Sequence, residues 1–182
     1  MDDKELEWEE LKTEHLITDE WIDLRSSRYR FPNGQEHEPF YSYSRRDFVV
    51  VVPFDENGNL ICVRQFRQGI KKVTTEFPAG GIEKDEGPDA ALPAAKRELQ
   101  EETGYVSDDW KHIMKIPSSP GISDNYADLY IARNCKKASG QALDETEYLN
   151  VNVISPAELQ TLIDQGRFEQ PIHLLAWLLA SR

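Results

Sequence analysis

The chain has 182 residues, of which 39% are hydrophobic and 30% are charged, and its formal net charge at pH 7 is −12. This length suits one domain with a short extension, and the acidic balance argues against general nucleic-acid binding, which needs a basic surface. The longest apolar runs are too short to span a bilayer, and the acidic N-terminus lacks the apolar stretch of a signal peptide, so no membrane association is expected.

The first 45 residues are expected to form an extension that contains strands. Residues 1–13 are rich in Glu and Lys and predict a short helix or a frayed end. Residues 21–30 and 39–44 are typical of extended segments, and the turn signal Phe31-Pro32-Asn33-Gly34 lies between them. Because these segments lack a core of their own, we expect them to pack on the main domain or on a second subunit. We therefore divide the chain into an extension, residues 1–45, and a main domain, residues 46–182.

The main domain begins with a pattern of strands. Residues 48–52 are continuously apolar, which is typical of a strand buried on both faces. The sequence Asp55-Glu56-Asn57-Gly58 indicates a hairpin. Further strands are expected at residues 60–63, 73–77, 128–132 and 149–154.

Three helices are expected in the same domain. The first covers about residues 93–103, with Pro93 in its first turn and Gly104 at its C-terminal end. The second starts at the capping box Ser155-Pro156-Ala157-Glu158 and runs to about Gly166, and the third covers the strongly apolar residues 171–180. This order of elements predicts an α/β fold in which helices enclose a mixed sheet.

The first helix carries three glutamates at helical spacing. Glu98, Glu101 and Glu102 are spaced i, i+3, i+4, so a helix projects them from one face. The repulsion between them is relieved by a divalent cation, and Mg²⁺ prefers a few carboxylates together with phosphate oxygens. The ordinary alternative is a solvated helix face on which Arg97 pairs with Glu101.

The loop before this helix makes the pattern much more specific. Gly80 is followed after five residues by Glu86, and later by Arg97-Glu98-Leu99-Gln100-Glu101-Glu102-Thr103-Gly104-Tyr105. This resembles the Nudix box, G-x5-E-x7-R-E-U-x-E-E-x-G-U, in which U is apolar. The chain departs from it between Glu86 and Arg97, where ten residues stand in place of seven. The extra residues can be absorbed as a longer loop before Pro93, and they affect the placement of Glu86 more than that of the helical carboxylates.

Other motifs resemble the ADP-ribose pyrophosphatase branch of that family. They are Ser119-Pro120-Gly121 after the box, Gln65-Phe66-Arg67 at the end of a strand, and the acidic loop Glu145-Thr146-Glu147. The branch often has a Glu shortly after its S-P-G loop, where this chain has Ser123-Asp124-Asn125. Either Asp124 substitutes for that Glu, or the Glu is unnecessary here.

The resemblance implies a role for each matching residue. Glu145 would take a proton from the attacking water, Arg97 would orient the carboxylates, and Glu101 would be a ligand or an orienter. The implied metal ligands are Glu98, Glu101, Glu102, Glu147 and the carbonyl of Ala79, which the turn at Gly80 exposes. The implied substrate-binding residues are Arg67, Glu76, Gly80 and Pro120. The ordinary alternatives are a surface arginine at position 67 and an acidic loop without a role at positions 145–147.

The resemblance also implies the activity. A Nudix α/β/α sandwich with an N-terminal β extension would hydrolyse the diphosphate of a nucleoside diphosphate sugar with Mg²⁺, or alternatively Mn²⁺. ADP-ribose, giving AMP and ribose 5-phosphate, is the leading substrate. The alternatives are another sugar nucleotide such as GDP-mannose, or a nucleotide-sensing module without catalysis. We further expect a cytoplasmic homodimer with reduced Cys62 and Cys135, and we interpret the four histidines as surface or core residues.

Overall fold

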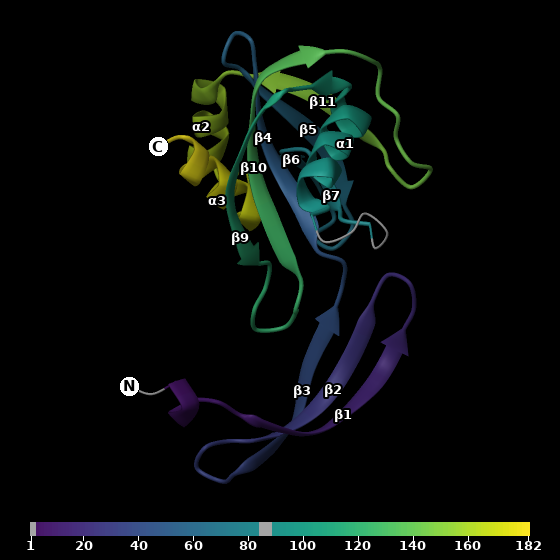
Figure 1. Ribbon diagram of the computed structural model, residues 1–182, viewed down its shortest axis with the longest axis vertical. Helices are drawn as coiled ribbons and strands as arrows, with labels where there is room; N and C mark the ends of the chain where they lie inside the picture. The colour runs from purple at the N-terminus through teal and green to yellow at the C-terminus, as the bar shows by residue number, and fades with distance from the viewer. Residues whose placement is uncertain (1–2, 84–88) are drawn as a thin grey trace. The chain divides into compact units, whose positions relative to one another are not determined.

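The structure, a computed structural model, describes residues 3–83 and 89–182. It divides into two units, of which the first comprises Met1–Arg46 with Pro117–Tyr126 and the second comprises Asp47–Ile116 with Ala127–Arg182. Each unit is built on its own β-sheet (Figure 1).

The described part of the first unit forms a three-stranded antiparallel sheet in the order β1-β2-β3. The strands are β1 (Glu9–Thr18), β2 (Asp23–Arg30) and β3 (Glu36–Ser44), and a short 3-10 helix, η1 (Asp3–Glu5), precedes them. Strands β2 and β3 confirm the two predicted extended segments, and Gly34 has a φ of 83° at the predicted turn between them.

The short helix predicted within residues 1–13 is limited, in the described residues, to η1, and its extension to residue 13 is wrong because β1 begins at Glu9. Glu9 accepts a 2.7 Å ion pair from Arg30, and Glu10 accepts a hydrogen bond from the Tyr29 hydroxyl. These cross-strand partners stabilise a strand whose sequence alone has no strand pattern.

Aromatic rings contact one another in the first unit. Trp8, Tyr29, Phe31 and Phe40 have ring centroids 4.3 to 6.1 Å apart. Within the described residues, every buried apolar side chain belongs to the second unit. The first unit therefore has a small aromatic cluster and no apolar core of its own.

The second unit contains a mixed sheet. In the described residues its strands are β4 (Phe48–Asp55), β5 (Leu60–Arg67), β6 (Lys72–Glu76), β7 (Ala79–Gly81), β8 (Tyr105–Val106), β9 (Asp109–Pro117), β10 (Tyr126–Lys137) and β11 (Leu149–Ile154). The central order is β11-β5-β4-β10-β8, and β10 runs parallel to β4 while β5 and β11 are antiparallel to their neighbours. All predicted strands of this unit are present, whereas β7, β8 and β9 were not predicted, because they are short or mix apolar and charged residues.

Helices cover both faces of this sheet (Figure 1). On one face α1 (Ala91–Thr103) packs Leu99 against Val49 and Val51. On the other face α2 (Pro156–Asp164) and α3 (Pro171–Ala180) enclose a core with the alternate residues of β4 and with Trp177. This is the predicted α/β/α sandwich.

The predicted helix ends are confirmed to within about two residues. Helix α1 begins two residues before Pro93, which still lies in the first turn, where its missing N–H is not needed. Gly104 ends α1 with a φ of 70°, and the capping box at Ser155 and Glu158 is formed at the start of α2. Helix α2 ends at Asp164, slightly earlier than predicted.

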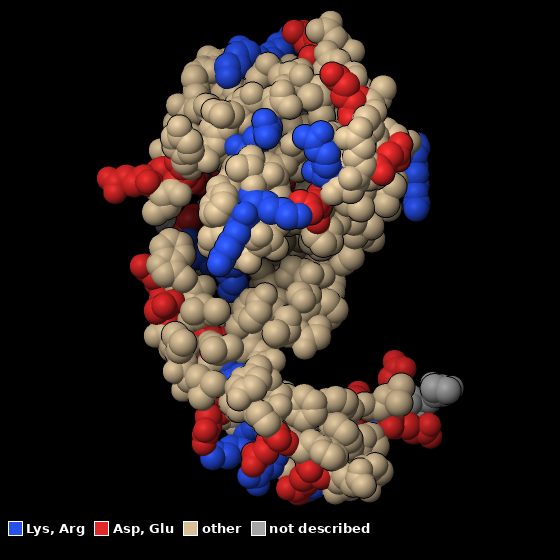
Figure 2. All heavy atoms as spheres, turned by 180° about the vertical axis from the view of Figure 1, so that it is seen from behind, with Lys and Arg blue, Asp and Glu red and all other residues tan. Residues whose placement is uncertain are grey.

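Charged side chains of both signs share the surface. Figure 2 shows Lys and Arg side chains near Asp and Glu side chains in both units. The ion pairs include Arg28 with Glu38 and Lys72 with Glu169. Within residues 3–83 and 89–182, no helix has the length and apolar character needed to cross a membrane.

Candidate active site

Two of the predicted carboxylates lie where α1 packs against β7. Glu98 and Glu102 are 6% and 2% exposed, because they follow one another on the side of α1 that faces Ala79–Gly81. The Ala79 N–H donates a 3.1 Å hydrogen bond to Oε2 of Glu102. A Cβ atom at Gly80 would lie 2.0 Å from Cδ of Glu98. Position 80 therefore requires glycine for Glu98 to occupy its place.

A third carboxylate joins them from the loop before β11. One carboxylate oxygen each of Glu98, Glu102 and Glu147 lie within 4.8 Å of one another. The Glu147 side chain accepts a 3.1 Å hydrogen bond from the amide of Asp144, which fixes it within its own turn. The structure thus brings together three of the predicted metal ligands, from two segments that lie far apart in the sequence.

The end of α1 holds this loop in place. The last carbonyls of a helix have no partner within it, and loop residues supply the donors here. The Ala142 amide donates to the carbonyl of Glu101 at 2.8 Å, and the side chain of Gln141 donates to the carbonyl of Glu102 at 2.8 Å. The helix that carries Glu98 and Glu102 therefore also positions the loop that carries Glu147.

The electrostatics of the three carboxylates favour a bound cation. Burial raises the pKa of Glu98 to about 7, against the opposing effect of Arg97. Burial and the charge of Glu98 raise the pKa of Glu102 well above its usual range. Negative charge is costly here because the surrounding groups compensate it incompletely. A set of oxygen ligands in this state fits a hard divalent cation.

Arg97 and Glu101 form the rim of this site. Arg97 donates to Glu98 at 2.7 Å, to Glu101 at 2.9 Å and to the carbonyl of Gly81 at 2.9 Å. Burial works against the charge of Arg97, but Glu98 and Glu101 raise its pKa above the usual value. The Glu101 side chain is 39% exposed and, in the described part of the chain, lies outside the group of three carboxylates. Its position fits an orienting role through Arg97 better than a ligand role.

Arg67, the last residue of β5, is held by the buried carboxylate of Glu76, the last residue of β6. Its Nε and Nη2 atoms donate to the two oxygens of Glu76 at 2.9 and 2.6 Å, and the Thr74 hydroxyl donates to the same carboxylate. Burial raises the pKa of Glu76, but Arg67, His173 and Thr74 together more than offset this and hold the pKa below its usual range. Glu76 is 0% exposed and so has no surface for a substrate, whereas the Arg67 side chain is 40% exposed.

The remaining predicted residues are not members of the carboxylate cluster within the described part of the chain. Glu145 is exposed in the turn before Glu147, and Pro120 is exposed in the first unit. Glu86 lies outside the described residues.

The segment that departs from the branch pattern has structural partners within the first unit. Asp124 accepts a 3.0 Å hydrogen bond from Arg25 of β2 and another from Ser44 of β3. Asn125 is buried and donates to the carbonyl of Arg46. These contacts give Asp124 and Asn125 structural partners within their own unit.

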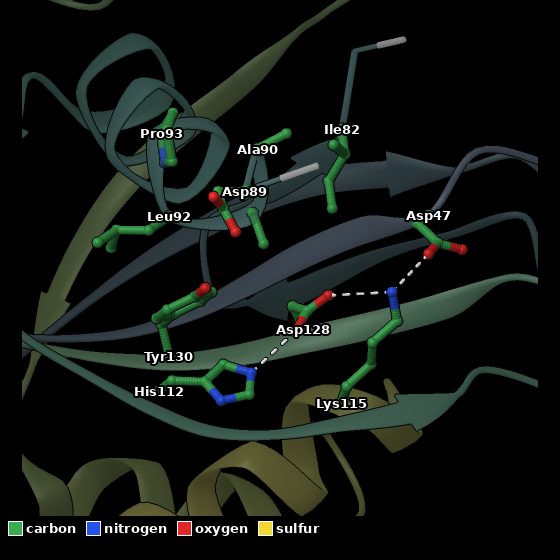
Figure 3. Close-up of a pocket in the computed structure, with 11 residues that line it drawn as sticks. Asp47, Ile82, Asp89, Ala90, Leu92, Pro93, His112, Lys115, Asp128 and Tyr130 are labelled. Atoms are coloured by element: carbon green, nitrogen blue, oxygen red, sulfur yellow. Dashed lines mark hydrogen bonds and ion pairs between the residues drawn. The ribbon is translucent and has the colours of Figure 1, made fainter. Parts of the chain in front are cut away.

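A separate pocket of about 630 Å³ lies beside the start of α1 (Figure 3). Lys115 of β9 extends between Asp47 and Asp128, at 2.8 and 3.6 Å, and His112 bonds Asp128 at 2.9 Å. The pocket shares none of its lining residues with the carboxylate cluster. Its lysine is already neutralised by carboxylates, so the pocket does not resemble a phosphate site.

Sequence reasoning missed one residue of the site region, His173. It is 1% exposed in α3, and its Nδ1 accepts a 3.0 Å hydrogen bond from the amide of Phe77, 96 residues away. Its interpretation as a core residue is correct, but no local pattern links it to the end of β6.

The comparisons with known proteins identify this arrangement. A family model described as the NUDIX domain matches residues 43–178. The chain belongs to the Nudix family. The predictions of this family, of its fold and of a hydrolase are thereby confirmed.

Individual Nudix relatives resemble the chain along most of its length. It is 30% identical over 164 residues to the methanol dehydrogenase activator of Bacillus methanolicus, covering 86% of this chain and 83% of that protein. It is 29% identical over 168 residues to the ADP-ribose pyrophosphatase of Bacillus subtilis (strain 168), covering 88% of this chain and 85% of that protein. A solved structure described as an ADP compounds hydrolase superposes with a TM-score of 0.78 at 22% identity, covering 96% of this chain and 92% of that one. At that identity the superposition speaks for the Nudix fold alone.

Proposed function

We propose that this Nudix protein hydrolyses the diphosphate of a nucleoside diphosphate sugar, and that ADP-ribose is its substrate, giving AMP and ribose 5-phosphate. The observation that carries the proposal is the cluster of Glu98, Glu102 and Glu147, with Arg67 held close enough for its pKa to be raised by Glu102 as well as by Glu76. Similarity to the ADP-ribose pyrophosphatase of Bacillus subtilis over most of its length supports this substrate over GDP-mannose.

The protein's own groups have distinct tasks in this reaction. Glu98, Glu102 and Glu147, with the carbonyl of Ala79, would hold Mg²⁺, which neutralises charge on the diphosphate and makes water more acidic. Arg67 binds a phosphate oxygen with the part of its guanidinium that Glu76 leaves exposed.

The remaining site residues position groups or move a proton. Arg97 keeps Glu98 and Glu101 in place through its three hydrogen bonds. Gly80 leaves the space that Glu98 needs. Glu145, which is exposed in the turn before Glu147, accepts the proton of the attacking water. Pro120 contributes to substrate binding, as the resemblance of Ser119-Pro120-Gly121 implies.

The proposal extends to assembly and location. Residues 1–45 form an extension at a homodimer interface and residues 46–182 form the Nudix hydrolase domain. The exposed apolar residues of the extension, including Trp21 at 63%, support such an interface. The two free, buried cysteines suit the reducing cytoplasm.

A substrate panel tests the proposal. The purified protein is incubated with Mg²⁺ and either ADP-ribose or GDP-mannose in ¹⁸O-labelled water, and products are identified by mass spectrometry. We expect AMP and ribose 5-phosphate from ADP-ribose, and the label identifies the phosphorus that is attacked. Faster turnover of GDP-mannose would move the assignment to that sugar nucleotide, and no turnover of any nucleoside diphosphate derivative would overturn it.

A further inference from the structure

His173 of α3 is a buried titratable residue that no step above uses. Burial lowers its pKa to about 4, so the ring is neutral at neutral pH. Its Nδ1 accepts the hydrogen bond from the Phe77 amide, so the neutral ring carries its proton on Nε2. That nitrogen lies 3.9 Å from Oε2 of Glu76. The ring therefore places its Nε2 nitrogen close to the carboxylate that holds Arg67.

Through Glu76, the contact of His173 is linked to the partly exposed guanidinium of Arg67. Glu76 accepts two hydrogen bonds from Arg67, and both use the Nε and Nη2 atoms. The orientation of the guanidinium thus follows from the position of one buried carboxylate. A change in the surroundings of Glu76 would turn the group that is proposed to bind phosphate.

Through Phe77, His173 is linked along the backbone to Ala79, which bonds Glu102 of the carboxylate cluster. Phe77 is followed by Pro78, whose carbonyl accepts a 3.0 Å hydrogen bond from Val51, and then by Ala79, whose amide donates to Glu102. His173 fixes the backbone at the start of this segment. One imidazole ring therefore touches both structural supports of the site.

We propose that His173 is a positioning residue for the diphosphate site, which it acts on through Glu76 and Arg67 and through the Phe77–Gly80 segment. The inference rests on the proposed function and deepens it. Residues that support the groups in contact with a metal or substrate typically contribute about 10- to 100-fold to affinity or activity.

Two substitutions separate the two contacts. His173→Asn keeps an acceptor near the position of Nδ1 but removes the Nε2 nitrogen beside Glu76, and His173→Leu removes both. We expect His173→Leu to lower kcat/KM for ADP-ribose by about 10- to 100-fold, mainly by raising KM. The kcat/KM of His173→Asn should lie between those of the wild type and His173→Leu. Trp177→Phe, in the same helix and core, is the matched control and should keep the wild-type KM. Melting temperatures are measured for all variants, and kinetics are compared well below each of them.

A double-mutant cycle with Arg67→Ala distinguishes positioning from general support of the fold. If His173 acts through Arg67, the loss in kcat/KM caused by His173→Leu becomes much smaller when Arg67 is already absent. Fully additive losses in kcat/KM would overturn the route through Glu76 and Arg67, and a folded His173→Leu protein with the wild-type KM would overturn the inference as a whole.

Binding of Mn²⁺, followed by electron paramagnetic resonance without substrate, provides a readout that does not depend on activity. We expect His173→Leu to weaken it by about 10-fold, because Ala79 no longer supports Glu102. Wild-type protein that binds Mn²⁺ but hydrolyses nothing would defeat the proposed function, whereas unchanged Mn²⁺ affinity in His173→Leu would defeat this inference.

Discussion

Filling the space at Gly80 is the most direct steric perturbation of the carboxylate cluster. In Gly80→Ala the new Cβ would lie 2.0 Å from Cδ of Glu98 and 2.1 and 2.3 Å from its two oxygens. Carbon atoms in contact prefer a separation of about 3.5 Å or more, so the carboxylate must withdraw by about 1.5 Å. A displacement of about 1 Å at a catalytic group can cost about 100-fold in rate.

We therefore expect Gly80→Ala to lower kcat/KM for ADP-ribose by about 100-fold and to raise the Mg²⁺ concentration needed for half-maximal rate. Gly69→Ala is the matched control, because a Cβ at Gly69 has nothing within 4 Å. Rates are measured against Mg²⁺ concentration for both variants and the wild type. A Gly80→Ala enzyme with wild-type rate and Mg²⁺ requirement would refute the assignment of Glu98 as a metal ligand.

Three further predictions concern stability. Arg67→Ala should lower the free energy of unfolding by about 1–3 kcal/mol, a range that allows for the partial exposure of Arg67, because buried Glu76 loses its ion pair; an unchanged urea midpoint at pH 7 would contradict this. The pKa of His173 is about 4 in the fold and 6.5 in its ordinary state, so the unfolded chain binds the proton first as pH falls. The free energy of unfolding should therefore fall by up to about 3 kcal/mol as the pH is lowered from 6.5 to 4. In His173→Leu, the free energy of unfolding measured with urea should lack this part of the pH dependence. Ser155→Ala should cost about 1 kcal/mol by removing the cap of α2, and a melting curve that matches the wild type would argue against the cap.

The elements that could be predicted from the sequence are those set by local rules. Gly104 ends α1 because a left-handed residue is needed there, and the Ser155 box starts α2 through bonds that span three residues. Strand β4 is predictable because its residues are buried on both faces. Strand β1 is not, because its stabilisation comes from partners on β2 such as Arg30, which only the folded register brings alongside.

The site residues likewise include some that local sequence predicts and others that depend on contacts formed only in the folded protein. Glu98 and Glu102 follow from the helical period and the Nudix box, whereas Glu147 follows from the resemblance of the acidic loop Glu145-Thr146-Glu147 to the ADP-ribose pyrophosphatase branch. The different position of Glu101 depends on its contact with Arg97 and on the exposure of that face of α1. His173 could not be predicted, because its partners, Phe77 and Glu76, are brought to it only by the packing of α3 on the sheet.

The central claim is that the buried carboxylates of α1 hold the metal for diphosphate hydrolysis. Its most direct test is the Mg²⁺-dependent release of AMP from ADP-ribose by the wild type, Glu98→Gln and Glu102→Gln. We predict release by the wild type and a loss of about 100-fold or more in both variants. Their melting temperatures should stay at or above the wild-type value, because each substitution removes a buried carboxylate that repels its neighbours. Wild-type rates of AMP release in both variants would contradict the claim.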